Sequence, residues 1–295
     1  MSGVLQSLVD GVSLGAVYAL VAVGLALVFG VMRLINFAHG ELITAAGYTL
    51  ALTASWPLPA GIAMSVLAAV ALAVVTERIA FRPLRSAPPA TALVTTFAVG
   101  FTLQAVWLIV FGPEGRTADV LADLNRTAIG GDVVIRWITL VQLAAGGTIL
   151  GGLVLLLNRT TIGLEMRAAA ADFRAARLLG VRADRVIVLA FVLAGISAAT
   201  VALLITASRP LVTPTFGLEV TILALVGVVA GGMDNLAYAT AGGFAVGLVT
   251  SVFGDILPAG DRVFLPAFVF AAVIVVLLVR PAGLFAPARG ATERV

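Results

Sequence analysis

The sequence predicts an all-α, polytopic transmembrane bundle with interrupted or re-entrant helices and about eight or nine membrane segments. The chain is 61% hydrophobic and 11% charged, whereas soluble domains carry roughly 25% charged residues. Nearly charge-free stretches recur at residues 12–31, 91–111, 138–157, 186–206 and 263–279. Each is long enough to cross about 30 Å of hydrocarbon as a helix, and none alternates in polarity as a barrel strand does. We expect one transmembrane domain over residues 1–295.

The composition excludes several functions. All 18 basic residues are arginine, so the chain lacks the lysine with which a P-loop reaches nucleotide phosphates. Cysteine is absent and His39 is the single histidine, which leaves no metal site to propose. The net charge is only +3 and the arginines cluster at predicted membrane ends, so we expect a lipid bilayer and no nucleic acid as a partner.

Arginine-rich loops set the expected orientation. Residues 78–85 and 158–185 carry clustered arginines, and such loops stay on the cytoplasmic side of a membrane. The tail, with Arg280, Arg289 and Arg294, joins them. The loop 112–137 mixes three arginines with four acidic residues and should lie outside. The N-terminus is therefore expected outside and the C-terminus in the cytoplasm.

Two segments combine polar residues with apolar flanks, which indicates interrupted helices. Asn36, His39 and Glu41 form the first group, and Asp234 and Asn235 follow a pair of glycines in the second. Ionisable groups at membrane depth are costly and usually face a cavity or the protein interior. The first group either lines a translocation path or gate, or caps a broken helix and satisfies its backbone. The second group is a candidate for polar contact with a solute.

Four pairs of glycines with three residues between them lie in apolar runs: Gly11 and Gly15, Gly147 and Gly151, Gly227 and Gly231, Gly243 and Gly247. Small residues let helix backbones approach closely in lipid, where close packing drives association. Most of these pairs should therefore pack within the bundle, and one or two could form a subunit interface.

Residues 158–185 form a cytoplasmic segment that favours helix from Gly163 to Gly180, where glycine suits a helix end. One interpretation is a solvated loop that only anchors the orientation. Its length favours the other, a docking surface for a partner protein, with Ala168 to Ala171 as a flat patch. Arg167, Arg174 and Arg177 would share one face, and Glu165 and Asp172 another. The candidate docking residues are Glu165, Arg167, Ala168, Ala169, Asp172, Arg174 and Gly180.

The run IGLEMRAAAADFRAARLLGVRADRV resembles the cytoplasmic coupling motif of membrane subunits of bacterial ATP-binding-cassette (ABC) importers, in the form found in the branched-chain amino acid permease family. YALVAVGLALVFGVMRLINFAHGEL resembles that family's first signature, and PTFGLEVTILALVGVVAGG and LVRPAGLF extend the likeness over nearly the whole chain. The N-terminal signature and the short tail resemble the LivH type. One departure is MDNLAYATAGG, which stands where the family commonly has Gly-Ser-x-Pro-Gly-Ala.

The resemblance implies a permease subunit in the bacterial inner membrane that forms half of an alternating-access path for amino acids, in the first place branched-chain ones. Its implied partners are a second permease (LivM-like or another copy of this chain), two ABC ATPase subunits that bind the ATP and Mg, and a periplasmic substrate-binding protein. This chain would hold no cofactor and would not be an enzyme. Alternatives are import of urea, short amides or another small polar solute, and an ion-gradient-driven secondary transporter or channel.

Overall fold

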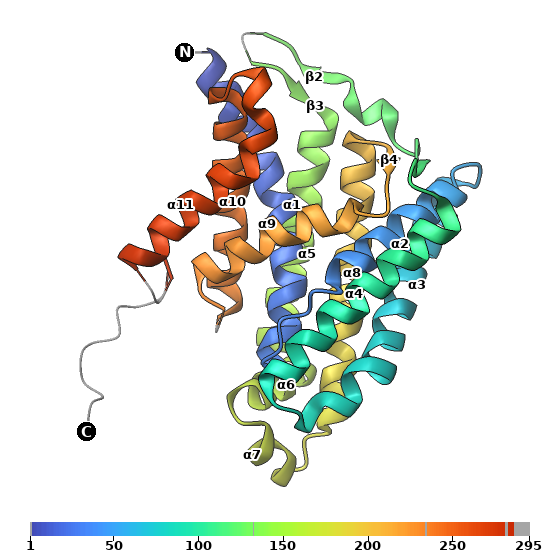
Figure 1. The fold of residues 1–295 in the computed structure, drawn as a ribbon, viewed down its shortest axis with the longest axis vertical. Helices are drawn as coiled ribbons and strands as arrows, with labels where there is room; N and C mark the ends of the chain where they lie inside the picture. Colours follow the sequence, from blue (N-terminus) through green and yellow to red (C-terminus); the bar gives the residue numbers. More distant parts are fainter. Residues whose placement is uncertain (1, 132, 234, 281–282, 286–295) are drawn as a thin grey trace.

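The computed structural model describes residues 2–131, 133–233, 235–280 and 283–285, and these form an elongated helical bundle (Figure 1). The α-helices of the described part are α1 (Ser2–Met32), α2 (His39–Leu52), α3 (Leu58–Thr76), α4 (Pro89–Phe111), α5 (Trp137–Arg159), α6 (Thr161–Ala171), α7 (Phe173–Leu178), α8 (Ala183–Ser208), α9 (Phe216–Gly231), α10 (Leu236–Ile256) and α11 (Leu265–Val279). The π-helical turn η1 (Glu77–Phe81) and the 3-10 turn η2 (Arg82–Ser86) extend α3, and the 3-10 turns η3 (Ala122–Asn125) and η4 (Ala259–Phe264) precede α5 and α11.

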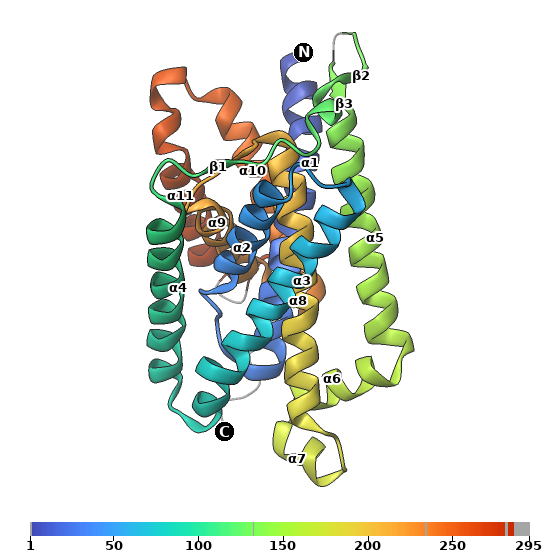
Figure 2. The same ribbon diagram turned by 90° about the vertical axis from the view of Figure 1, so that its right-hand side faces the viewer.

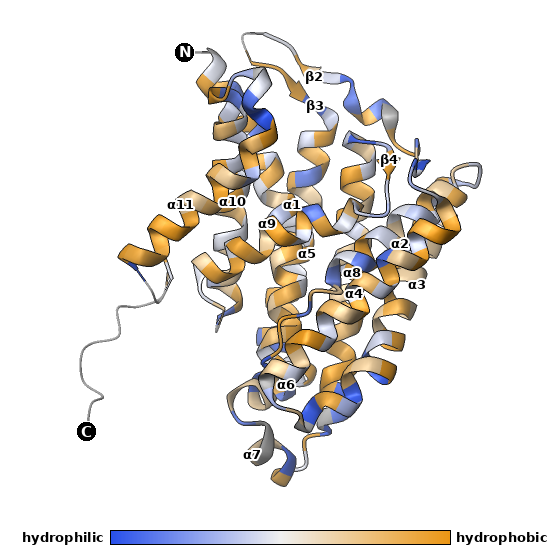
Figure 3. Cartoon of the chain, viewed as in Figure 1, coloured by the Kyte–Doolittle hydropathy of each residue, from blue (hydrophilic) through white to orange (hydrophobic). Residues whose placement is uncertain are grey.

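The number of membrane segments agrees with the sequence. Seven helices of the described part are long and apolar enough to span a membrane. One shorter apolar helix, α9, brings the total to eight. Figure 3 shows hydrophobic residues along most of the helical length, with many hydrophilic ones in the loops at the two ends of the bundle. The predicted class, a polytopic helical membrane protein, is confirmed.

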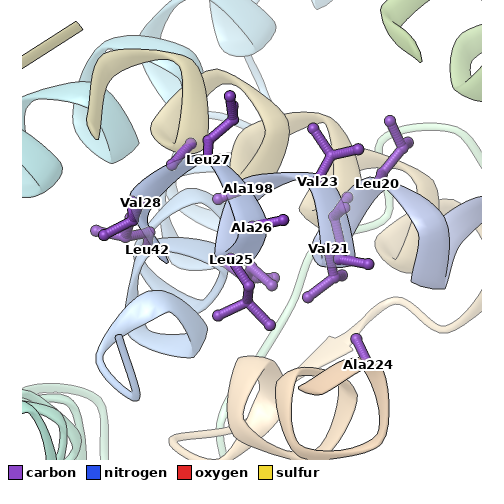
Figure 4. Close-up of a cluster of buried hydrophobic side chains, with 14 of the residues drawn as sticks. Leu20, Val21, Val23, Leu25, Ala26, Leu27, Val28, Leu42, Ala198 and Ala224 are labelled. Carbon is purple, nitrogen blue, oxygen red and sulfur yellow. The ribbon is translucent and has the colours of Figure 1, made fainter. Parts of the chain in front are cut away.

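Helix α1 runs through the centre of the bundle. Leu20, Val21 and Val28 are completely buried, as expected of a helix that is apolar all round. Figure 4 shows Val28 of α1 beside Leu42 of α2, with Leu20 and Val21 further along α1 and Ala224 on α9. Helices α5, α8, α9 and α10 all contact α1, so α1 links most of the other membrane segments.

Both predicted interruptions are present. Helix α1 ends at Met32, Arg33 takes a positive φ of 53°, and α2 begins six residues later at His39. Helix α9 ends at Gly231, and Gly232 takes a φ of 115° before α10 begins. Positive φ ends an α-helix and suits glycine, so the second break lies at the glycines that the sequence indicated.

The two short helices, α2 and α9, pack against each other. The Gly217 backbone N–H donates a hydrogen bond of 3.0 Å to the Thr44 hydroxyl. A methyl group added at Gly40 would lie 2.9 Å from the Gly217 carbonyl carbon, closer than carbon atoms approach in a packed interior. Glycine is therefore required at this crossing for the backbones to meet.

Three of the four glycine pairs pack inside the bundle, as expected. A methyl group on Gly15 would lie 2.8 Å from the Phe244 carbonyl oxygen, and a methyl group on Gly227 would lie 2.8 Å from the Gly242 carbonyl oxygen. The exception is the α5 pair, Gly147 and Gly151, where an added methyl group would meet no atom of another described element within 4 Å. This pair faces away from the rest of the chain.

Two small antiparallel ladders lie at the end of the bundle opposite α6 and α7 (Figures 1 and 2). Strand β1 (Arg116–Thr117) pairs with β4 (Leu211–Val212), with Arg116 opposite Val212. Strand β2 (Thr127–Ile129) pairs with β3 (Ile135–Arg136). The ladder of β1 and β4 ties the loop between α4 and α5 to the segment that leads into α9.

Candidate functional site

Asn36, His39 and Glu41 at the first interruption are almost fully buried, with exposed fractions of 2%, 0% and 1%. The Asn36 side-chain oxygen accepts a hydrogen bond of 3.1 Å from the Ala38 backbone N–H, and its carbonyl accepts one of 3.2 Å from His39. Asparagine side chains favour such turns because they substitute for a backbone partner. Asn36 therefore shapes the start of α2, which corresponds to the capping alternative.

His39 packs directly against Gly24 of α1, where a methyl group would lie 2.7 Å from the His39 Nε2. Neither imidazole nitrogen has a hydrogen-bond partner among the described residues. Because neither nitrogen is hydrogen-bonded, packing alone holds the ring. A buried polar group without a partner lowers the stability of a fold. The absence of a side chain at Gly24 creates the space that His39 fills.

Glu41 connects α2 to α4. Its carboxylate accepts a hydrogen bond of 2.9 Å from the Trp107 indole N–H. Next to it, the Tyr48 ring stacks on Phe111 with 3.9 Å between centroids. A carboxylate removed from water needs such a donor, so Trp107 is a structural partner of Glu41 that the sequence did not reveal.

The second interruption places Asn235 at the start of α10. Its side-chain oxygen accepts hydrogen bonds from the backbone N–H groups of Ala237 at 2.8 Å and Tyr238 at 3.3 Å, which is a helix N-cap. Asp234, the other predicted solute contact, lies outside the described residues.

A large apolar cavity of about 930 Å³ lies over one side of α1, between α5 and α10, and reaches α6. Asn235 lines it together with Asn158 and Arg167, all three toward the α6 end. Asn36, His39 and Glu41 do not line it. The structure thus places the two predicted groups of gate residues in different surroundings, the first in packed interior and the second at a cavity.

A tight joint connects α5 to α6. The Thr160 hydroxyl accepts a hydrogen bond of 3.1 Å from the Gly163 N–H and donates one of 2.6 Å to the Leu156 carbonyl. A methyl group at Gly163 would overlap the Leu157 carbonyl, so only glycine fits there. We call this joint, residues 156–163, the elbow.

Helix α6 turns part of the predicted docking patch inward. Ala169 and Met166 are 2% and 3% exposed, so the expectation that Ala169 belongs to an open alanine surface is wrong. Arg167 is exposed and donates a 2.7 Å hydrogen bond to Asn158. Glu165 and Ala168 are half-buried. The alanines instead allow α6 to lie close to the bundle.

The predicted single helix from Gly163 to Gly180 is two helices. Asp172 is extended, with φ −150°, and its side chain accepts a 3.0 Å hydrogen bond from the Ala175 N–H. Aspartate competes with helix continuation in this way and begins a new helix instead. Helix α7, which contains Arg174, ends at Leu178. Gly180 follows with φ +88°, and the Val181 N–H donates a hydrogen bond of 3.0 Å to the Ala176 carbonyl. The predicted role of Gly180 at the C′ position is confirmed.

Two leucines at the end of α7 are the most exposed large apolar residues of this segment. Leu178 and Leu179 are 89% and 85% exposed. The sequence analysis passed over them, although adjacent leucines before a helix-ending glycine on an otherwise polar segment were the available signal. Together with Leu164, which is 60% exposed, they form what we call the leucine tip.

An ionic cluster lies at the same end of the bundle. The guanidinium of Arg85 in η2 bonds both to Glu77 of η1 and to Asp184 in the first turn of α8. Glu77 is buried, with 1% of its side chain exposed. The cluster therefore fastens the loop after α3 to the helix that follows α7.

Comparison with known proteins assigns the family. Residues 7–279 match the family described as branched-chain amino acid transport system, permease component. The chain is 30% identical to the branched-chain amino acid permease protein BraD of Pseudomonas aeruginosa, with 95% of each chain covered. It is 29% identical to LivH of Salmonella typhimurium and 28% identical to LivH of Escherichia coli K12, with 95% of this chain and 94% of the relative covered in both cases.

The fold also has a solved counterpart, an ABC transporter assigned to the metal-chelate type in an inward-facing conformation. The TM-score is 0.52 at 16% identity, over 94% of this chain and 87% of that one. This likeness concerns the fold. The family match over residues 7–279, together with the seven candidate membrane spans of the described residues, shows that this multi-pass membrane protein belongs to the branched-chain amino acid permease component family.

Proposed function

We propose that this permease is one half of the membrane pathway of an ABC importer that carries amino acids, in the first place branched-chain ones, into a bacterial cell. Two ATPase subunits would bind and hydrolyse ATP with Mg, a second permease would complete the pathway, and a periplasmic binding protein would deliver the solute. The α6–α7 end would face the cytoplasm. The names of the relatives, BraD and LivH, support the substrate class.

The observation that carries this proposal is the leucine tip. Large apolar side chains that stand out into water mark partner surfaces, and Leu178 and Leu179 are almost completely exposed. Exposed arginines at 177, 182 and 185 surround them. An apolar contact rimmed by positive charge fits an ATPase groove with apolar walls and acidic edges.

Three contacts would transmit a displacement of α6 and α7 to the membrane helices. The elbow joins α6 rigidly to α5 through the two hydrogen bonds of the Thr160 hydroxyl. Arg33, at the end of α1, donates a 3.2 Å hydrogen bond to the Ala170 carbonyl. Helix α8 follows α7 in the chain and contacts both α6 and α7. Movement driven by ATPase closure would thus reach α1, α5 and α8 together, as alternating access requires.

The test is reconstitution of the permease pair with the ATPase subunits and the binding protein in proteoliposomes. ATP-dependent uptake of radiolabelled leucine is the expected result, with competition by valine and isoleucine and none by urea or acetamide. Uptake by this chain alone, without ATPase subunits, would refute the proposal.

A matched pair of variants tests the docking surface. Leu178→Ser with Leu179→Ser should weaken co-purification of the ATPase pair and reduce uptake, since the apolar contact is lost. Ile79→Ser is the control, because Ile79 is 73% exposed at the same end but outside α6 and α7. Equal loss in both variants would show that general surface hydrophobicity, and not the leucine tip, holds the complex.

A further inference from the structure

A second cavity, of about 560 Å³, lies at the end of the bundle opposite α6 and α7. We call it the polar cavity. It lies between the outer parts of α1, α5, α8, α9 and α10 and the turn before α11. Six charged residues line it, three acidic and three basic: Asp10, Glu219, Asp255, Arg136, Arg209 and Arg262.

We propose that the polar cavity is a receiving site for a zwitterionic amino acid, occupied after the solute leaves the binding protein and before the pathway opens inward. The proposal rests on the proposed function and adds to it a site and the feature that is recognised. The feature is an ammonium and a carboxylate on the same small molecule.

The charges around the cavity are available to a ligand. Within the described part of the chain, none of the six forms an ion pair, and all six are exposed. Asp10 accepts one hydrogen bond, from Gln6 at 3.1 Å. Three acidic and three basic residues suit a solute that carries one positive and one negative charge. A solute with a single charge would meet as much repulsion as attraction.

The floor of the cavity is a prearranged polar network. Gln142 is 7% exposed, accepts a hydrogen bond from the Ser13 hydroxyl, and donates one of 3.3 Å to Ser208. Thr139 lines the cavity one turn away and is 6% exposed, and its hydroxyl makes no hydrogen bond within the described residues. The Thr139 oxygen itself is accessible, so the hydroxyl is open to the cavity. Thr139 therefore supplies a donor and acceptor that a solute can use.

Aliphatic residues of the lining can contact a branched side chain. They are Leu14, Val17, Ile138, Ile205, Val220, Leu223 and Leu265, and Tyr18, Thr250, Ser251 and Gly254 complete the lining. The volume lies within the roughly 300–1,000 Å³ typical of small-ligand sites. The lining thus offers both charged groups and aliphatic groups, the two kinds of contact that leucine, valine or isoleucine needs.

The polar cavity does not continue into the apolar cavity. Val17 lines the polar cavity and Ala26 the apolar one. They are nine residues apart on α1, about two and a half helical turns, so they project from opposite sides. Below the polar cavity, α1 and α10 are in backbone contact, since a methyl group on Gly243 would lie 2.8 Å from the Tyr18 carbonyl oxygen. A solute in the polar cavity would stay there until these helices separate.

Equilibrium binding of radiolabelled leucine to the complete complex in detergent, without binding protein, tests the site directly. Arg209→Gln and Glu219→Gln should each weaken binding by about tenfold or more, since each removes a charge-assisted contact. Arg116→Gln and Glu114→Gln are matched controls, exposed at the same end but outside the cavity, and should bind as the unaltered complex does. Isoamylamine and 4-methylpentanoate, which lack one charge each, should compete at least about tenfold less well than unlabelled leucine.

Three results would overturn the inference. Leucine binding could be unchanged in both cavity variants, or the single-charge analogues could compete as well as leucine. The variants could also lose affinity for the binding protein, measured by surface plasmon resonance, while leucine binding stays intact, which would make the charges a protein-docking surface. Failure of the proposed function looks different, because the unaltered complex would then show no ATP-dependent leucine uptake.

Discussion

Removal of the Arg85 guanidinium should destabilise the protein strongly, and Arg85→Met is the variant to make. Arg85 is the bonding partner of the buried Glu77 carboxylate. Loss of one partner of a buried ion pair costs about 3–5 kcal/mol because the other charge stays in a low-dielectric environment. The second partner, Asp184, is 68% exposed, so its pairing adds only about 0–1 kcal/mol. We therefore expect a loss of about 3–5 kcal/mol in the free energy of unfolding.

The controls separate charge burial from loss of packing. In the double variant Glu77→Met and Arg85→Met, no buried charge is left without a partner, and replacement of a buried pair by apolar residues is often neutral. Most of the lost stability should return. Asp184→Asn should cost no more than about 1 kcal/mol, because Asp184 itself is 68% exposed and Arg85 keeps its pairing with Glu77.

Reversible unfolding in mixed detergent micelles, with SDS as the denaturant and tryptophan fluorescence as the signal, measures these free energies. A loss below about 1 kcal/mol for Arg85→Met would show that Glu77 is not held by this pair. A double variant as unstable as the single one would show that the arginine acts through its aliphatic stem instead.

Three further substitutions test the packing of the first interruption and of α6 by the same measurement. Trp107→Phe should cost about 1–3 kcal/mol, because the buried Glu41 loses its donor, while Glu41→Gln, which keeps an acceptor, should cost less; equal losses would contradict this. Gly24→Ala should cost about 1–3 kcal/mol through overpacking against His39, and His39→Ala in the same chain should recover part of it; no recovery would show that the methyl meets another obstacle. Ala169→Leu should lower stability because the Ala169 side chain is buried. A variant that keeps its stability but loses ATPase binding would show that Ala169 contacts the ATPase instead.

The membrane segments and their interruptions could be predicted from the sequence because local features determine them. Long charge-free runs fix the spans, and the polar residues after Met32 and the glycines at 231 and 232 mark the breaks. The division of residues 163–180 was missed because alanine-rich helix propensity was weighed above the capping strength of one aspartate, Asp172. Propensity is a weak guide where a side chain offers the backbone another partner.

Contacts between distant segments were beyond prediction. Arg136, Arg209 and Glu219 look like ordinary loop or helix-end charges, and only the packing of α5, α8 and α9 around α1 brings them to one cavity. The same holds for Glu41 and Trp107, which are 66 residues apart in sequence. With a single sequence, no pattern relates such residues, since their proximity is a property of the assembled bundle.

The elbow makes α5 a stiff lever. From Arg159 at the elbow to Gln142 in the floor of the polar cavity, the helix measures about 25 Å at 1.5 Å per residue, and it is an unbroken α-helix. A rod of this kind, clamped at one end to α6, tilts as a unit. A small rotation imposed at the ATPase end would therefore strain the hydrogen bonds of Gln142 to Ser13 and Ser208 at the far end, so nucleotide chemistry on one side of the membrane could loosen the grip on a solute at the other.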